Sequence, residues 1–402
     1  MSFRRVVVVC FFALASHSVW AQLPASKKLS AEDQRELKRE LARLKNLLPT
    51  ANDKAAIELQ IANWYSVGGQ YAEAMRLLRK VVDADLGFDP SRDPDFAVLR
   101  HTREFQAILD QVHRQTPPLS NSRRITAIDE RDLLPENLAF DSTGDAFLLG
   151  STTRNQISRC SIHGECAVLV TSRSGVPGYV LGLKVDKGSG SIWAATNTQA
   201  GASVREYNIK TGQVERIAQL DGKHVFNDLA LSSNGVVYVT DTSEGSVYQL
   251  RPEDSVLRRI APEHRFTAAN GIAISSDDRL LYVSAWGDGI DVIDLRTRSV
   301  EPIRHPDDVC LAFIDGLYWV DGNLVAIQNG PMVPRIVRLK LNRRGKEVVE
   351  MAILERRNPL FDGITTGVIV DKELYYVANP QTDKKRSAKL DPLQVLAVQV
   401  VR

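Results

Sequence analysis

Short β-rich runs, each opened by a polar pair, recur along the last two thirds of the chain. The stretch "NDLALSSNGVVYVTDT" begins at Asn227, and "NGIAISSDDRLLYVSA" begins at Asn270. In both, apolar residues alternate with small or polar ones, a turn follows, and a second β-rich run ends the unit. Such alternation, bounded by Gly, Asn, Asp and Ser, predicts half-buried strands joined by tight turns.

Related units begin at nearly fixed intervals. Their aligned first residues are Glu136, Leu181, Asn227, Asn270, Asp315 and Thr366. By subtraction, the spacings are 45, 46, 43, 45 and 51 residues. A period of roughly 45 residues with several strands per unit is typical of a β-propeller. Residues 124–402 have room for six such units, so the sequence predicts a mainly β fold with a six-bladed propeller over this range.

The ends of the repeat region predict how the propeller closes. The segment "RRITAIDERD", which starts at Arg123, can pair with the final run "LQVLAVQVV" and complete the last blade. Closure of this kind removes exposed strand edges. In each unit, the first alternating strand should line the central channel. The six aligned residues should then form a ring at one mouth of that channel.

A different pattern precedes the repeats, over residues 30–115. The run "AEDQRELKRELARLKNLL" is rich in strong helix formers, with apolar residues at helical spacing. After it, small residues (Ala62, Ala74) alternate with aromatic ones (Tyr65, Tyr71) around a Gly-Gly turn, which resembles a tetratricopeptide helix pair. We expect a small helical segment that either docks a protein partner or packs against the propeller. The polar, Pro-containing stretch "RQTPPLSNSRR" marks the boundary.

Residues 1–21 have the pattern of a secretory signal peptide. Two Arg residues precede an apolar run from Val6 to Ala15, and a plausible cleavage site follows Ala21. The run is too short to span a bilayer, although a membrane anchor is the alternative. The sequence thus predicts a bacterial periplasmic or secreted protein with no membrane span after cleavage. A formal net charge of +2 gives no electrostatic case for nucleic acid.

Cysteine usage agrees with export. Cys160 and Cys166 lie six residues apart in "CSIHGEC", which predicts a disulfide across a tight hairpin. Two unpaired thiols are the alternative. Cys310 should remain free. The spacing is not a zinc pattern, because no second Cys/His pair accompanies it.

Four of the six aligned residues carry carboxylate or carboxamide oxygens, namely Glu136, Asn227, Asn270 and Asp315. A hard divalent cation such as Ca²⁺ takes oxygen ligands of this kind, with water completing the shell. The ring contains no Cys or His, which disfavours zinc or copper as its natural ion. Taken singly, Asn-Asp and Asn-Gly pairs are typical of turns, so a purely structural role is the alternative. Their shared position in the repeat favours a metal site.

These motifs resemble those of the gluconolactonase, senescence-marker-protein and luciferin-regenerating-enzyme family, which is related to paraoxonases and strictosidine synthases. The resemblance covers about residues 125–400 and rests on "LPENLAFD", "FNDLALSSNG", "ANGIAISSDD" and "IDGLYWVDGN". It implies a central Ca²⁺, or another divalent ion such as Zn²⁺, Mn²⁺ or Mg²⁺. The implied ligands are Glu136, Asn227, Asn270 and Asp315, and Asp315 is also the implied general base.

One position departs from the paraoxonase pattern. Those relatives carry a catalytic His at the phase of Leu181, whereas His163 and His224 lie off that phase and are interpreted as surface or loop residues. The hypothesis is therefore a divalent-metal-dependent, lactonase- or esterase-like hydrolase acting on a small lactone or ester at the channel. Asp228 is a second candidate for the general base, with a strand-start cap as its alternative role. Candidate substrate contacts, by phase, are Lys184, Asp241 and Asn379.

Two other functions stay open at this point. The propeller could be a non-catalytic binding module whose helical segment docks a protein, because propellers host both roles. A strictosidine-synthase-like ligase is a further alternative, although no residue outside the shared propeller pattern favours it.

Overall fold

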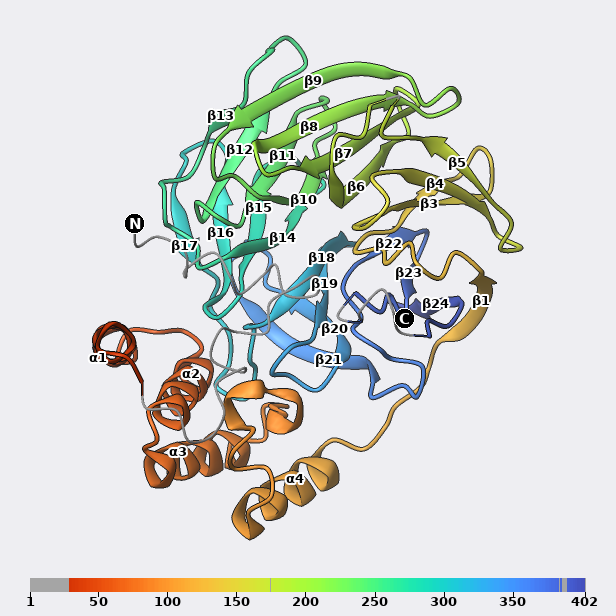
Figure 1. The fold of residues 1–402 in the computed structure, drawn as a ribbon. Helices are drawn as coiled ribbons and strands as arrows, with labels where there is room; N and C mark the ends of the chain where they lie inside the picture. Colours follow the sequence, from red (N-terminus) through yellow and green to blue (C-terminus); the bar gives the residue numbers. More distant parts are fainter. Residues whose placement is uncertain (1–28, 174, 383, 385–388, 402) are drawn as a thin grey trace.

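The computed structural model describes residues 29–173, 175–382, 384 and 389–401. The predicted signal peptide lies outside these residues. Within them, four α-helices precede six four-stranded antiparallel sheets arranged around a common centre (Figure 1). The prediction of a mainly β fold, with a six-bladed propeller preceded by helices, is confirmed.

The first three blades follow the chain in order. Blade 1 consists of β2 (Ala139–Asp141), β3 (Ala146–Gly150), β4 (Ile157–Ser161) and β5 (Cys166–Val170). Blade 2 consists of β6 (Tyr179–Asp186), β7 (Ser191–Asn197), β8 (Gly201–Asn208) and β9 (Val214–Asp221). Blade 3 consists of β10 (Phe226–Leu231), β11 (Val237–Asp241), β12 (Ser246–Leu250) and β13 (Arg258–Arg259).

The last three blades include the closing strand. Blade 4 consists of β14 (Ala269–Ile274), β15 (Leu280–Ala285), β16 (Gly289–Asp294) and β17 (Val300–Pro302). Blade 5 consists of β18 (Ile314–Val320), β19 (Asn323–Gln328), β20 (Arg335–Leu341) and β21 (Val348–Arg356). Blade 6 consists of β22 (Gly367–Val370), β23 (Glu373–Val377), β24 (Leu393–Gln399) and β1 (Arg123–Ile128). Because β1 pairs antiparallel with β24, the predicted closure is confirmed.

The first strand of each blade along the chain, from β2 to β22, lies at the centre, next to the first strands of both neighbouring blades (Figure 1). Two glycines allow this close approach. A Cβ atom on Gly182 of β6 would lie 2.5 Å from the backbone oxygen of Asn227, and one on Gly271 of β14 would lie 2.4 Å from that of Asp315. Any larger residue would therefore push the inner strands apart.

Hydrophobic side chains fill the space between consecutive blades. Between blades 2 and 3, for example, Trp193 and Val204 pack with Phe226 and Tyr248 in one buried cluster. The alternation seen in the sequence supplies these residues, because successive side chains of a strand point to opposite faces and each blade is covered on both.

The helices are α1 (Ala31–Leu47), α2 (Lys54–Val67), α3 (Tyr71–Asp83) and α4 (Arg103–Gln115), with 3₁₀ turns η1 (Pro90–Arg92) and η2 (Pro94–Phe96) between α3 and α4. Ser30 caps α1 through a capping box with Asp33. Apolar residues of the helical segment share one buried cluster with Phe313 and Met332 of the propeller. The interpretation that the helices pack against the propeller is confirmed.

The helical segment docks on blades 4 and 5 through backbone as well as side chains. Phe88 forms an antiparallel bridge with Met332, the Asp89 N–H donates to the Pro331 oxygen at 2.8 Å, and the Val333 N–H donates to the Gly87 oxygen at 2.8 Å. The contacted turn joins β19 to β20, which is the end of blade 5 where β18 begins. The helices therefore lie on the same face of the propeller as the start of that inner strand.

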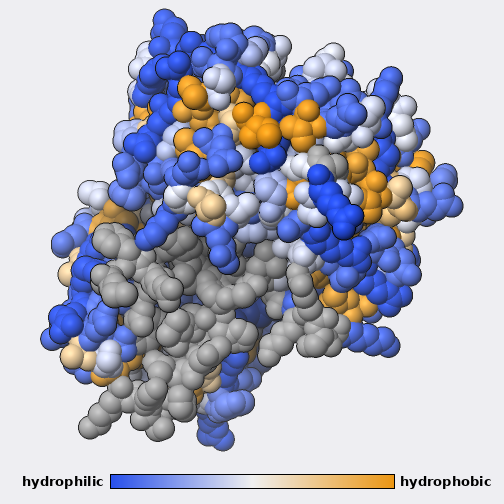
Figure 2. Space-filling view, turned by 45° about the horizontal axis from the view of Figure 1, so that its top comes forward, coloured by the Kyte–Doolittle hydropathy of each residue, from blue (hydrophilic) through white to orange (hydrophobic). Residues whose placement is uncertain are grey.

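The predicted disulfide between Cys160 and Cys166 is present in the β4–β5 hairpin, and Cys310 is buried and free. Among the described residues, no helix is both long enough and apolar enough to cross a membrane. Where residues are coloured in Figure 2, hydrophilic ones predominate and hydrophobic ones form several separate groups.

Candidate metal centre in the propeller channel

The repeat brings the predicted ligands to equivalent places. Asn227, Asn270 and Asp315 lie near the starts of the inner strands β10, β14 and β18, and Glu136 lies just before β2. Two of them are in direct contact, because the Asn270 Nδ2 donates to Asp315 Oδ1 at 2.7 Å. Asp315 also lies near enough to Glu136 for its charge to raise the pKa of that residue. These interactions bring Glu136, Asn270 and Asp315 together, and Asn227 shares their place in the repeat.

Hydrogen bonds between blades fix the backbone at this level. In four places, a side chain of one blade donates to the carbonyl oxygen that precedes an aligned residue of the next blade. These bonds are Asn137 to Val180 (3.1 Å), Asn197 to Phe226 (2.8 Å), Thr242 to Ala269 (2.6 Å) and Ser284 to Ile314 (3.0 Å). Between blades 6 and 1, the Thr366 hydroxyl donates instead to the carbonyl oxygen of the aligned residue Glu136 itself, at 2.6 Å. Buried bonds of this kind hold the candidate ligands in register.

The orientation of the Asn227 amide follows from its partner. Thr242 gives its single hydroxyl proton to the Ala269 carbonyl, so it can only accept from Asn227. Asn227 Nδ2 accordingly donates to Thr242 Oγ1 at 3.2 Å. The NH₂ group is thereby turned to the protein, and the carbonyl oxygen Oδ1 is left for another partner.

Asn270 shows the same arrangement in a more buried setting. Its NH₂ group donates to the Asp315 carboxylate. An ionised carboxylate can accept hydrogen bonds but cannot donate them. Its Oδ1 is buried and has no hydrogen-bond partner among the described residues. Burial of a carbonyl oxygen without a hydrogen bond costs roughly 1–3 kcal/mol of folding free energy, so binding of a ligand to this oxygen would be favourable.

Burial disfavours the charged form of both carboxylates of the ring. Burial, and secondarily the nearby Asp315, raise the pKa of Glu136 to about 8. Burial also raises the pKa of Asp315, although hydrogen bonds from Asn329 and Asn270 oppose this shift. Two buried carboxylates that share one site resist ionising together unless a cation joins them.

Asp228 adds a third carboxylate to the channel. Lys184 of β6 pairs with Asp228 Oδ1 at 2.9 Å, and its ammonium lies 5.6 Å from the ring centre of Tyr318. Asp228 Oδ2 is buried without a hydrogen-bond partner among the described residues. The sequence prediction placed Lys184 near the ring by phase, and the structure brings it to this carboxylate.

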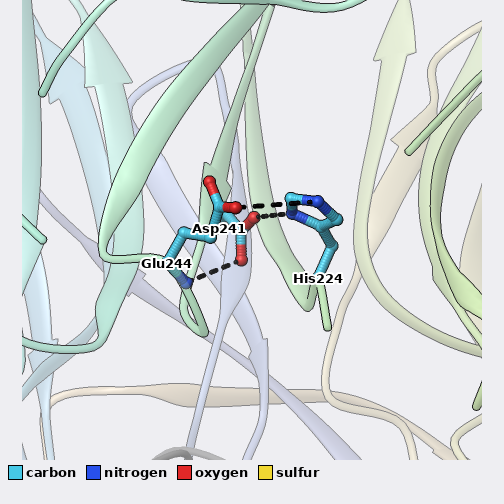
Figure 3. A group of neighbouring side chains, drawn as sticks. All are labelled: His224, Asp241 and Glu244. Atoms are coloured by element: carbon cyan, nitrogen blue, oxygen red, sulfur yellow. Dashed lines mark hydrogen bonds and ion pairs between the residues drawn. The ribbon is translucent and has the colours of Figure 1, made fainter. Parts of the chain in front are cut away.

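The other two residues predicted to contact substrate lie elsewhere. Asp241 is fully buried at the end of β11, where it binds His224 at 2.6 Å (Figure 3) and accepts from backbone N–H groups. Asn379 follows β23 and holds blade 6, because it donates to the Pro392 oxygen and accepts from the Gln394 N–H. Among the residues that the structure describes, neither side chain contacts the ring directly, and their assignment as substrate contacts stays an untested prediction.

The histidines and Leu181 are placed as follows. Leu181 is buried in β6 and offers no polar atom at its phase. His163 is exposed in the β4–β5 turn, as expected. His224 lies in the loop before β10, in agreement with its interpretation as a surface or loop residue, and it is partly buried between two carboxylates.

Sequence reasoning missed Asn329, which contacts the ring directly. Its Nδ2 donates to Asp315 Oδ2 at 2.6 Å and to the Ile364 oxygen at 2.5 Å. A signal was present in the repeat, because Asn or Asp also stands near the end of the second strand of other blades, at Asn197, Asp241 and Asn379. A second aligned position could thus have been read beside the first.

Comparisons with known proteins bear on the fold. No family model and no curated protein matches the sequence. Among solved structures, the allergen Mala s 1 of Malassezia sympodialis is similar with a TM-score of 0.56 and 14% identity, over 69% of this chain and 96% of that one. This likeness supports the propeller fold alone.

Gluconolactonase and luciferin-regenerating enzyme are also among the structural neighbours. A gluconolactonase from Xanthomonas campestris has a TM-score of 0.49 and 16% identity, over 70% of this chain and 97% of that one. A luciferin-regenerating enzyme has a TM-score of 0.47 and 14% identity, over 67% of this chain and 92% of that one.

Proposed function

We propose that this protein is a divalent-metal-dependent hydrolase of the lactonase type, which opens a small lactone or ester at the propeller channel. The main support is Asn270 Oδ1, a buried oxygen with no hydrogen-bond partner among the described residues, in contact with the buried carboxylate of Asp315 and near that of Glu136. Such a group of oxygens fits a hard cation. The motifs around Glu136 and Asn227 that resemble the gluconolactonase family point to the same chemistry.

The residues present fit a divalent ion held by Glu136, Asn227, Asn270 and Asp315. Both amides have their NH₂ groups tied to the protein, which leaves carbonyl oxygens of the kind Ca²⁺ prefers. The charges also balance. Three ionised carboxylates and the Lys184 ammonium sum to −2, which a divalent cation would cancel. When bound, such an ion would polarise the carbonyl of a lactone and favour its attack by water.

Hydrogen bonding distinguishes the two candidates for the general base. Both oxygens of Asp315 already accept amide N–H groups, from Asn270 and Asn329. Asp228 has one oxygen on Lys184 and on the Leu229 N–H, and its Oδ2 has no partner among the described residues. Asp228 Oδ2 is therefore the better-placed acceptor for a proton from water, while Asp315 orients the site.

The protein's part in the reaction is a proton transfer. Asp228 takes a proton from the water whose oxygen attacks the carbonyl carbon, and Lys184 holds the carboxylate in place. As the ring carbon–oxygen bond breaks, Asp228 returns that proton to the departing alkoxide oxygen. The product is a hydroxy acid, and the carboxylate is regenerated.

We also infer that the protein works outside the cytoplasm, in the periplasm or in the secreted fraction. The Cys160–Cys166 disulfide supports this location, because such bonds persist mainly in oxidising compartments. The charged, then apolar, pattern of residues 1–21 supports it as well.

A panel of sugar lactones and simple esters tests the proposed activity. Turnover should require added Ca²⁺, Mg²⁺, Mn²⁺ or Zn²⁺, should stop with chelator, and should be lost in Asp315→Asn. Asp321→Asn is the matched control, since Asp321 lies in the exposed turn of the same blade at φ 46°, which Asn adopts readily. If no substrate is turned over under any of these metals, while the ion still binds, a non-catalytic binding module replaces the hydrolase.

A further inference from the structure

His224, Asp241 and Glu244 form a compact cluster at one end of blade 3, and none of them belongs to the predicted ring. Each offers one ligand atom, and these atoms all lie within 4.8 Å of one another. Figure 3 shows the imidazole facing the two carboxylates, which come from the end of β11 and the turn after it. The function proposed above makes no use of these three side chains.

Asp241 fixes the protonation pattern of the imidazole. Its Oδ2 lies 2.6 Å from His224 Nδ1, and its Oδ1 accepts backbone N–H groups from Val225, Ser243 and Glu244. In the neutral imidazole, this carboxylate selects the tautomer that carries its proton on Nδ1. The other ring nitrogen, Nε2, then carries a lone pair, and a carboxylate placed behind a histidine in this way is the usual support of a metal ligand.

Glu244 presents a matching free oxygen. Its Oε2 accepts from the Tyr248 hydroxyl at 2.5 Å and from Arg259 at 2.9 Å. Its Oε1 faces His224 Nε2 at 3.7 Å, too far for a hydrogen bond between them. Two ligands of one tetrahedral zinc ion, with bonds near 2.0–2.1 Å, stand about 3.4 Å apart. The gap therefore suits an ion with little movement of either side chain.

The cluster lies close in the chain to Asn227, one of the candidate ring ligands. Thr242, next to Asp241 in the chain, accepts the amide of Asn227 and so joins the cluster to the ring. His224 precedes Asn227 by three residues, which places their Cα atoms at most about 11 Å apart.

We propose that His224 Nε2 and Glu244 Oε1 bind a second divalent ion of the Zn²⁺ class, with Asp241, Tyr248 and Arg259 holding the two ligands from behind. A nitrogen ligand selects such borderline ions over Ca²⁺, which takes oxygen ligands. The remaining coordination positions would be open to water or to a carboxylate or carbonyl oxygen of a bound molecule. The proposal does not rest on the hydrolase activity.

Titration of the whole protein with Co²⁺ in excess Ca²⁺ tests this site, because Co²⁺ reports protein ligands by its visible absorption. We expect a Co²⁺ band that Zn²⁺ displaces, with at least a tenfold loss of Co²⁺ affinity in His224→Ala and Glu244→Gln. His264→Ala is the matched control, since His264 also faces a glutamate, Glu263 at 3.6 Å, but is exposed and has no second carboxylate partner among the described residues. Asp315→Asn should keep the band.

Absence of the band in the unaltered protein, or its persistence in His224→Ala, would overturn the proposal. If His224→Ala does not fold, labelling of the unaltered protein with diethylpyrocarbonate decides instead. Zn²⁺ should protect His224 from labelling and leave His264 reactive. Equal labelling of His224 with and without Zn²⁺ contradicts the site.

Discussion

Asn329 ties the Asp315 carboxylate to the next blade. The side-chain NH₂ group of Asn329 donates to Asp315 Oδ2 at 2.6 Å and to the Ile364 backbone oxygen at 2.5 Å. The turn that begins at Asn329 is also bound by the helical segment, through the bridge between Phe88 and Met332. The orientation of a candidate ligand therefore depends on the packing of the helices as well as on the propeller.

Removal of this amide should weaken the metal centre without unfolding the blade. A hydrogen bond to a charged group contributes about 1.5–3 kcal/mol, so Asn329→Ala should lower the affinity for Ca²⁺ by roughly tenfold or more. Isothermal titration calorimetry measures this change. Asn323→Ala is the control, because Asn323 donates only to a turn carbonyl in the same blade. Equal affinities in the two variants would contradict the positioning role of Asn329.

The propeller could be predicted from the sequence because its signals are local. The alternation within each strand and the period near 45 residues can be read from the sequence without knowing how the blades pack, because each blade repeats the same fold. The phase of Glu136, Asn227, Asn270 and Asp315 followed from that repeat. Closure by the segment starting at Arg123 followed from the need to cover the last edge.

The partners of individual side chains could not be predicted in this way. Phase alone grouped Lys184, Asp241 and Asn379, yet only Lys184 reaches the channel carboxylates, because the other two bond within their own blades. Which atom of Asn227 faces the channel depends on Thr242, whose own proton goes to the next blade. These side-chain orientations and hydrogen-bond partners depend on contacts between blades, which cannot be read from any single stretch of sequence.

The pKa of Glu136 predicts that metal binding releases a proton. In the metal-free protein, burial and Asp315 raise this pKa to about 8, so Glu136 is largely protonated at pH 7. A cation binds the ionised form of Glu136, so the affinity of the protein for the cation should rise as the pH increases toward 8 and should level off above pH 8. Calorimetry at pH 7 in two buffers of different ionisation enthalpy should show close to one proton released. Glu136→Gln should abolish the release.

The same shift predicts how the metal-free fold responds to pH. Because the pKa of Glu136 is higher in the folded state than its ordinary value of 4.5, its contribution to stability is complete below pH 4.5 and is lost as the pH rises through about 8. Urea unfolding with chelator should therefore show a free energy of unfolding that falls between pH 5 and pH 8. This fall should be smaller in Glu136→Gln, and an identical fall in both proteins would contradict the assignment.

Asp228 and Asp315 should differ in what their loss removes. Asp228→Asn keeps size but loses the proton acceptor, so kcat should fall by about 10²–10⁴-fold, while Ca²⁺ affinity changes little. Asp315→Asn should lower both kcat and the affinity for Ca²⁺, because a charged ligand is lost. Parallel measurement of kcat and metal affinity separates these outcomes. A loss of metal affinity in Asp228→Asn as large as that in Asp315→Asn would make Asp228 a ligand rather than the base.

Metal binding should also stabilise the fold, because the ligands come from four different blades and meet only when the ring is closed. An ion that binds the folded state alone, at a free concentration of 100 times its dissociation constant, contributes about 2.7 kcal/mol. The melting temperature should thus be higher with Ca²⁺ than with chelator, and this difference should nearly vanish in Asp315→Asn. Asp321→Asn should retain it, since its carboxylate lies in an exposed turn. If chelator leaves the melting temperature of the unaltered protein unchanged and elemental analysis finds no ion, the channel holds no metal and the orphaned oxygens of Asn270 and Asp228 must be satisfied by water.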